Sequence, residues 1–161
     1  MSKIEAKKLF YVDECGIDEH LIREYGRAPR GEKVCGEVSG KKFDRQNIIS
    51  ALNLCKPVAA FGFKGYCDSI LFETWLEKVL IPELSPGDVV VVDNAKFHKS
   101  EKARKLIENA ECRLVFLPPY SPDLNPIEHF WDWLKNKVRD IAHMFKTLEF
   151  AILAAVNTRR I

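Results

Sequence analysis

The chain has 161 residues, of which 47% are hydrophobic and 30% charged, and its formal net charge at pH 7 is +2. This length and balance exclude a disordered chain, and we expect residues 1–161 to form a single globular domain. No apolar run reaches the roughly 18–20 residues that span a bilayer, and the N-terminus lacks a signal-peptide apolar region, so we expect a cytoplasmic protein without a membrane partner.

The first half of the chain is predicted to be rich in strands. A short polar lead over residues 1–7 precedes an apolar run at residues 9–15, which predicts a strand. Irregular polar chain with glycine and proline breakers follows as far as Gly31. The other strands predicted in this half are residues 32–39, 43–54 and 58–64.

The second half alternates helices with strands. Asp68 or Ser69 is a candidate cap for a helix to about Ile81, whose apolar residues recur at helical spacing. Four consecutive valines within residues 88–93 predict a strand buried on both faces. The remaining predicted elements are helices at residues 100–109, 125–141 and 147–156 and a strand at residues 113–117. This order predicts an α/β fold, a mixed sheet flanked by helices on both faces.

Two apolar runs of this sheet end in acids, Asp13 and Asp93. In open α/β sheets the functional crevice lies beyond the carboxyl ends of the strands, and we expect both acids at such ends. Either acid alone is more often a turn or cap residue, so the hypothesis of a site rests on the set.

Glu128 follows a loop rich in proline and is the third candidate. With Asn125 as the N-cap and Pro126 at the first helical position, Glu128 would complete a capping box and serve only its helix. The helical wheel also places Glu128 at the edge of the apolar stripe, where it would face the crevice. Both interpretations stay open at this point.

Three carboxylates at one crevice suit phosphodiester cleavage. Two divalent ions ~3.5–4 Å apart activate a water and stabilise the leaving oxygen in an in-line displacement. Mg²⁺ takes oxygen ligands and keeps several waters, so a few carboxylates suffice. The cysteines are odd in number and widely spaced, which favours reduced thiols over a zinc site or a disulfide framework.

Several segments of the chain resemble the catalytic domain of DDE transposases, and within them the bacterial insertion-sequence branch of the mariner-like superfamily. These segments are residues 11–14, 25–32, 91–98 and 117–131. Thirty-four residues separate Asp93 from Glu128 (128 − 93 − 1), which is the spacing of that superfamily. The resemblance extends from about Lys8 to Val156.

The resemblance implies an RNase H-like fold with Asp13, Asp93 and Glu128 as catalytic residues and metal ligands. It implies cofactors of Mg²⁺ or Mn²⁺, two ions in number, that support DNA strand cleavage at element ends and strand transfer. The implied partners are double-stranded DNA, with a TA target, and a second copy of the chain in a homodimer. The implied location is the bacterial cytoplasm, in association with the nucleoid.

Other polar residues near these motifs are secondary candidates. Asn94 and His98 follow the second acid, where they orient a carboxylate, contact a phosphate or only make local hydrogen bonds. Arg27 and Arg30 lie between Arg23 and Arg45, where seven basic residues stand against four acidic ones, as in a phosphate-contacting segment or a solvated loop. Two further residues receive no metal role: Glu14, on the opposite strand face from Asp13, and His129, expected to be an exposed helix residue.

Full-length members of this family carry an N-terminal helix-turn-helix region, and this chain begins almost at its first predicted strand. We therefore expect that region to be absent here, as in a remnant, a truncated gene or a split-frame product with an upstream helix-turn-helix partner. The alternative function is a non-catalytic fragment that binds DNA or dimerises and modulates a full-length transposase. A third hypothesis, a nuclease acting on RNA–DNA hybrids, is disfavoured by the proline-rich loop before Glu128.

Overall fold

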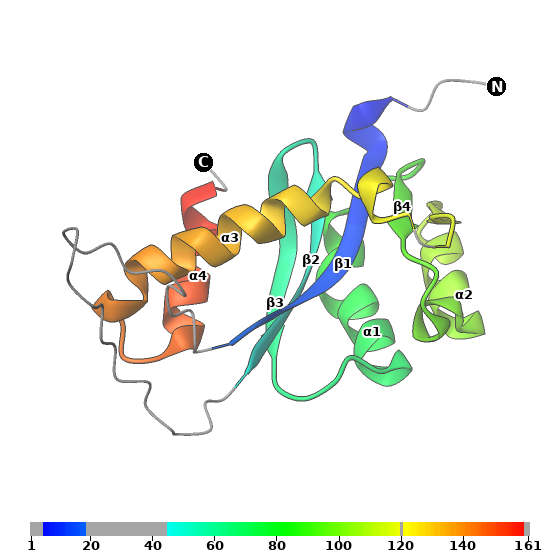
Figure 1. Ribbon diagram of the computed structural model, residues 1–161. Coiled ribbons are helices and arrows are strands. Elements are labelled where there is room, and N and C mark those ends of the chain that lie inside the picture. Colours follow the sequence, from blue (N-terminus) through cyan, green and yellow to red (C-terminus); the bar gives the residue numbers. More distant parts are fainter. Residues whose placement is uncertain (1–4, 19–44, 120, 160–161) are drawn as a thin grey trace, which may run out of the picture.

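The computed structural model describes residues 5–18, 45–119 and 121–159, which build a five-stranded sheet with helices packed against it (Figure 1). The strands lie in the order β3-β2-β1-β4-β5. β1, β2 and β3 pair antiparallel, whereas β4 and β5 run parallel to β1. Their bounds are Leu9–Ile17 for β1, Gln46–Asn53 for β2, Lys56–Phe63 for β3, Val89–Val92 for β4 and Arg113–Phe116 for β5.

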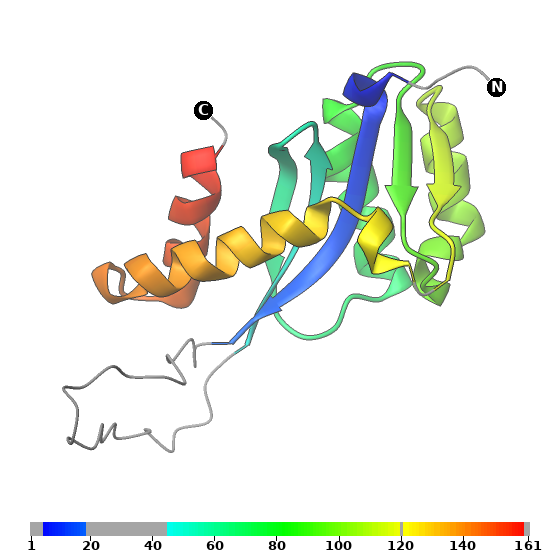
Figure 2. The ribbon, with the colours of Figure 1, turned by 45° about the horizontal axis from the view of Figure 1, so that its top comes forward.

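Four α-helices cover the two faces of this sheet, as the two ribbon views agree (Figures 1 and 2). One hydrophobic cluster joins α1 and α2 to one face, and a second cluster joins α3 and α4 to the other. The helices are α1 (Ser69–Trp75), α2 (Glu101–Asn109), α3 (Ile127–Ile141) and α4 (Leu148–Arg159). The predicted mixed sheet with helices on both faces is therefore confirmed.

The alternation of side chains along β1 decides which acid faces which helices. Phe10 and Val12 belong to the core under α1 and α2, while Cys15 and Ile17 belong to the core under α3 and α4. Because successive strand residues point to opposite faces, Asp13 is directed toward α3 and Glu14 toward α1 and α2.

The predicted helix over residues 69–81 is helical but not α-helical throughout. α1 ends at Trp75, residues 76–80 form a π-helical stretch, and Ile81–Glu83 form a 3₁₀ turn. The buried side chains of Trp75, Leu76 and Leu80 keep one apolar face through this change of hydrogen-bonding pattern. The strand predicted at residues 32–39 lies outside the described residues.

Asp68 is the N-cap of α1, since its Oδ1 accepts a hydrogen bond of 2.8 Å from the backbone N–H of Leu71. Replacing Asp68 with alanine is expected to lower the free energy of unfolding by about 1 kcal/mol, because one helix donor loses its partner. Urea unfolding followed by circular dichroism measures this loss. Asp68→Asn is the control and should be nearly neutral, since asparagine caps helices equally well.

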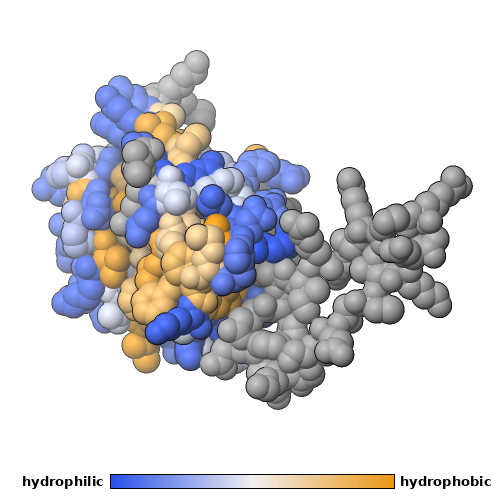
Figure 3. Space-filling model, turned by 90° about the vertical axis from the view of Figure 1, so that its left-hand side faces the viewer, coloured by the Kyte–Doolittle hydropathy of each residue, from blue (hydrophilic) through white to orange (hydrophobic). Residues whose placement is uncertain are grey.

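α4 is apolar around much of its circumference. Ala151, Ile152 and Ala155 are buried, while Phe150 and Leu153 are exposed. Figure 3 shows apolar surface gathered on the side of the molecule where α3 ends and α4 lies. Within the described segments, no helix combines the length and the apolar character needed to cross a membrane.

Candidate active site

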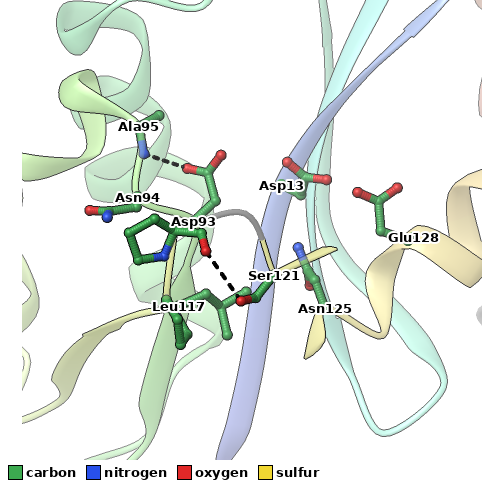
Figure 4. A pocket seen from close by; sticks show the side chains of 10 residues that line it. Asp13, Asp93, Asn94, Ala95, Leu117, Ser121, Asn125 and Glu128 are labelled. Carbon is green, nitrogen blue, oxygen red and sulfur yellow. Dashed lines mark hydrogen bonds between the residues drawn. The ribbon is translucent and has the colours of Figure 1, made fainter. Parts of the chain in front are cut away.

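One cavity of about 450 Å³ opens where β4 ends, and the three acids singled out from the sequence line it (Figure 4). Asp13 comes from β1, Asp93 directly follows β4, and Glu128 lies in the first turn of α3. The wall is completed by Asn94, Ala95, Leu117, Pro118, Pro119, Ser121 and Asn125. Three separate elements thus bring three carboxylates to one hollow.

Asp13 does not lie at the end of its strand, so that part of the prediction is wrong. β1 continues to Ile17 because β2 pairs with it along that length. The parallel partner β4, however, is in register with β1 only over Leu9–Tyr11. Asp13 therefore lies just beyond the point where the parallel pairing stops, and this leaves its carboxylate room to face the cavity.

Trp131 of α3 holds the Asp13 carboxylate. Its indole Nε1 donates a hydrogen bond of 3.2 Å to Asp13 Oδ2, and the Trp131 side chain is buried. Burial, followed by the charges of Glu14 and Glu128, raises the pKa of Asp13 to about 7. Burial and, after it, the neighbouring negative charges thus oppose ionisation of Asp13.

Replacing Trp131 with phenylalanine is expected to raise the pKa of Asp13 further, because the lost N–H donor favours the ionised carboxylate. The pKa is measured by nuclear magnetic resonance titration of the Asp13 side-chain carbon. Trp133→Phe is a matched control, since Trp133 lies on the same helix and packs on Phe130. An unchanged Asp13 pKa in Trp131→Phe would contradict the assigned contact.

Within the part of the chain that the structure describes, the contacts that hold Asp93 are all on one oxygen. Its Oδ1 accepts a hydrogen bond of 2.9 Å from the backbone N–H of Ala95 and lies 2.6 Å from His98 Nδ1. The hydrogen bond from His98 is the main reason why the pKa of Asp93 lies below its ordinary value. With Oδ1 engaged twice and the side chain 48% exposed, Oδ2 remains available to the cavity.

His98 joins two carboxylates. The ring is fully buried, packs against Phe72 and Phe97, and places Nε2 3.0 Å from Glu14 Oε1. Burial alone lowers the pKa of His98, but the hydrogen bonds to Asp93 and Glu14 outweigh it and raise the pKa to about 9. The protonated ring has a donor on each nitrogen and satisfies both acids at once.

Glu14 is the residue that sequence reasoning left without a role. Its face of β1 was predicted correctly, yet its contact with His98 spans 84 positions and no local pattern reveals it. The sequence did contain one indication that Glu14 has a partner. Glu14 shares its face with the buried Phe10 and Val12, and a carboxylate on a core-facing position requires a partner.

The capping box predicted around Asn125 is not formed. α3 begins at Ile127 with Pro126 in the cap position, and no side chain of the described residues caps it with a hydrogen bond. Asn125 and Glu128 instead line the cavity. The Asn125 side chain is buried, and its Oδ1 has no hydrogen-bond partner in the described structure. Both side chains therefore face the hollow rather than the helix terminus.

Of the secondary candidates from the sequence, some lie at the cavity and others do not. Asn94 lines the cavity and His129 is exposed on α3, while Arg27 and Arg30 lie outside the described residues. Among the residues that the structure describes, no three His, Cys, Asp or Glu side chains are grouped closely enough to hold a metal ion. The acids thus share a cavity without converging on one point.

The chain matches the model of the family described as DDE superfamily endonuclease over residues 8–150. It belongs to that family. The matched region covers most of the chain and includes all three acids of the cavity. The resemblance to DDE transposases noted from the sequence is confirmed, while the bacterial insertion-sequence branch stays a prediction.

Curated relatives include transposases. The chain is 34% identical over 71 residues to the transposable element Tc1 transposase of Caenorhabditis elegans, covering 44% of this chain and 26% of that protein. It is 40% identical over 79 residues to the uncharacterized protein y4pE/y4sA of Sinorhizobium fredii, covering 45% of this chain and 56% of that protein. The chain therefore spans only part of the length of these relatives.

Solved structures share the fold at low sequence identity. The Mos1 transposase paired-end complex with left transposon end gives a TM-score of 0.62 at 14% identity, covering 96% of this chain and 53% of that chain. The catalytic core domain of BIV integrase gives a TM-score of 0.60 at 12% identity, covering 94% of this chain and 82% of that chain. The RNase H-like fold expected from the sequence is confirmed, and the chain is a DDE domain like transposase and integrase catalytic cores.

Proposed function

We propose that this chain is a transposase catalytic domain that cuts DNA strands and transfers them in a reaction dependent on divalent metal ions. The observation that carries the proposal is the single cavity that Asp13, Asp93 and Glu128 line from three different elements. Family membership supports the same chemistry. The described elements share one sheet, which supports a single-domain organisation.

The donor set of the cavity fits a hard divalent cation. All three acids offer oxygen ligands, as Mg²⁺ and Mn²⁺ prefer. Charge crowding at Asp13 and the unpartnered buried Oδ1 of Asn125 are features that a cation, with its bound waters, would relieve. Asp13, Asp93 and Glu128 would hold two ions, which would supply an activated water and stabilise the leaving oxygen.

The protein's own part is to fix these ligands. Trp131 orients Asp13 from α3, and His98 with the Ala95 N–H orients Asp93 behind β4. Glu128 is exposed at the start of α3, where it closes the third side of the cavity. Ligands fixed in this way lose little entropy when a phosphodiester and its metal ions bind.

Double-stranded DNA is the proposed substrate and partner. Mos1 transposase, which shares the fold, is seen in a complex with a transposon end and in a strand transfer complex. A TA target, a homodimer and an upstream helix-turn-helix polypeptide belong to the same proposal, with support from the resemblance to mariner-like transposases.

Nicking of supercoiled DNA tests the proposal. The chain should nick DNA with Mg²⁺ or Mn²⁺ and not with a chelator, and Glu128→Gln should lose this activity. Asp140→Asn is the matched control, because Asp140 is an exposed acid near the other end of α3. Folded protein that binds DNA without nicking it, whether or not metal is present, would support the alternative of a non-catalytic modulating fragment.

A further inference from the structure

A chain of three side chains runs from the far face of the sheet to the cavity. Glu14 Oε1 lies 3.0 Å from His98 Nε2, and His98 Nδ1 lies 2.6 Å from Asp93 Oδ1. Glu14 comes from β1, and Asp93 and His98 come from the segment after β4. The two strands that carry Asp13 and Asp93 are thus tied together by side chains as well as by their ladder.

We infer that Glu14 is a positioning residue, which acts through the ring of His98 to fix the Asp93 carboxylate for metal binding. This inference rests on the proposed function, because it concerns the same site. Glu14 does not line the cavity that holds the three acids, so it does not contact a metal ion there directly. Its charge also acts on Asp13, and Glu14→Gln, which removes the charge but keeps the acceptor for His98, separates that effect from the route through His98.

The rigidity of the connection supports the assignment. The His98 side chain is fully buried and rests on the ring of Phe72 at a centroid distance of 4.4 Å and on that of Phe97 at 4.2 Å. A ring held by two aromatic neighbours can turn little, and a carboxylate on each nitrogen fixes its remaining freedom. The position of Asp93 is therefore set by Glu14 as well as by the local turn at Ala95.

The neighbour of Glu14 supports this role further. The Cys67 thiol donates a hydrogen bond of 3.8 Å to the same Glu14 oxygen, and the Glu14 side chain is only 18% exposed. Two partners thus hold the same oxygen of Glu14 in a half-buried place.

Manganese affinity is the readout, because Mn²⁺ binding is measured by electron paramagnetic resonance without any DNA cleavage. Glu14→Ala should weaken Mn²⁺ binding at least about tenfold, as loss of a residue that orients a metal ligand commonly does. Glu14→Gln should stay within about threefold of the wild type, since its amide oxygen still accepts from His98 Nε2.

Glu73 offers a matched control. It is also a half-buried glutamate with a cationic partner among the described residues. Its side chain is 12% exposed, and its Oε2 lies 3.3 Å from Lys102 Nζ, away from the cavity. Glu73→Ala should lower thermal stability and leave Mn²⁺ affinity unchanged. A merely structural role for Glu14 would give Glu14→Ala this same behaviour, and that result would overturn the inference.

Two further outcomes are decisive. If Glu14→Gln lost as much affinity as Glu14→Ala, the charge of Glu14 rather than its hold on His98 would matter, and the inference would be wrong. If Glu14→Ala did not fold, Glu14→Leu, which fills similar space but offers no acceptor to His98 Nε2, would be compared with Glu14→Gln in its place. Absence of Mn²⁺ binding by the wild type would overturn the proposed function as well, whereas equal binding by wild type and Glu14→Ala would overturn only the inference.

Discussion

Replacing Asp93 with asparagine is expected to abolish metal-dependent nicking, with a loss on the order of a thousandfold or more. The amide oxygen of the new side chain still accepts from the Ala95 N–H, so the local turn is preserved. What disappears is the negative charge and the second carboxylate oxygen that faces the cavity. The loss is therefore expected in the chemical step rather than in folding.

The measurement is the rate of supercoiled DNA nicking at saturating Mg²⁺, with circular dichroism to verify the fold. Asp123→Asn is a suitable control, because Asp123 is an exposed acid in the short turn before α3 and does not line the cavity. Retention of a tenth or more of the wild-type rate by Asp93→Asn would remove Asp93 from the catalytic set.

Replacing Asp13 with asparagine is expected to stabilise the metal-free protein while it removes the response to metal. Asp13 keeps its proton up to a pKa of about 7 in the folded chain, against an ordinary value of 3.8. The folded state thus binds more protons than the unfolded state between these values, and stability falls as pH rises through this window. The neutral asparagine avoids this loss, which is worth about 2 kcal/mol after allowance for partial solvent exposure.

Thermal unfolding at about pH 4 and at about pH 8 measures this difference. The gain from Asp13→Asn should be small at the lower pH, where Asp13 is protonated in the folded state and close to half protonated in the unfolded state, and full at the higher pH. The stabilising effect of His98, lost as pH rises from 6.5 through about 9, is common to both proteins and cancels. Added Mn²⁺ should stabilise the wild type only, and equal stabilisation of both proteins would exclude Asp13 as a ligand.

Local patterns in the sequence predict much of this fold. The four valines of β4 are all buried as expected, and Asp68 caps α1 as one of its two predicted cap residues. α2 begins at Glu101 after its N-cap Ser100, in agreement with the helix predicted at residues 100–109. These features depend on residues close in sequence. The three acids of the cavity were also found from the sequence, by the ends of apolar runs and by the family resemblance.

Features that depend on distant partners escaped prediction. The length of β1 depends on β2, so the acid at position 13 ends an apolar run without ending the strand. Asn125 has the residue type of a helix cap, yet its side chain faces the cavity, because the packing of α3 on the sheet decides its direction. The link from Glu14 to His98 is of the same kind.

The contacts that fix the acids join parts of the chain that are far apart in sequence. The hydrogen bond from Trp131 to Asp13 spans 118 positions, and that from His98 to Glu14 spans 84. Contacts of such separation form late in folding, since the entropy of closing long loops must first be overcome. We therefore expect the proposed DNA-cleaving activity to appear only after these long-range contacts have formed.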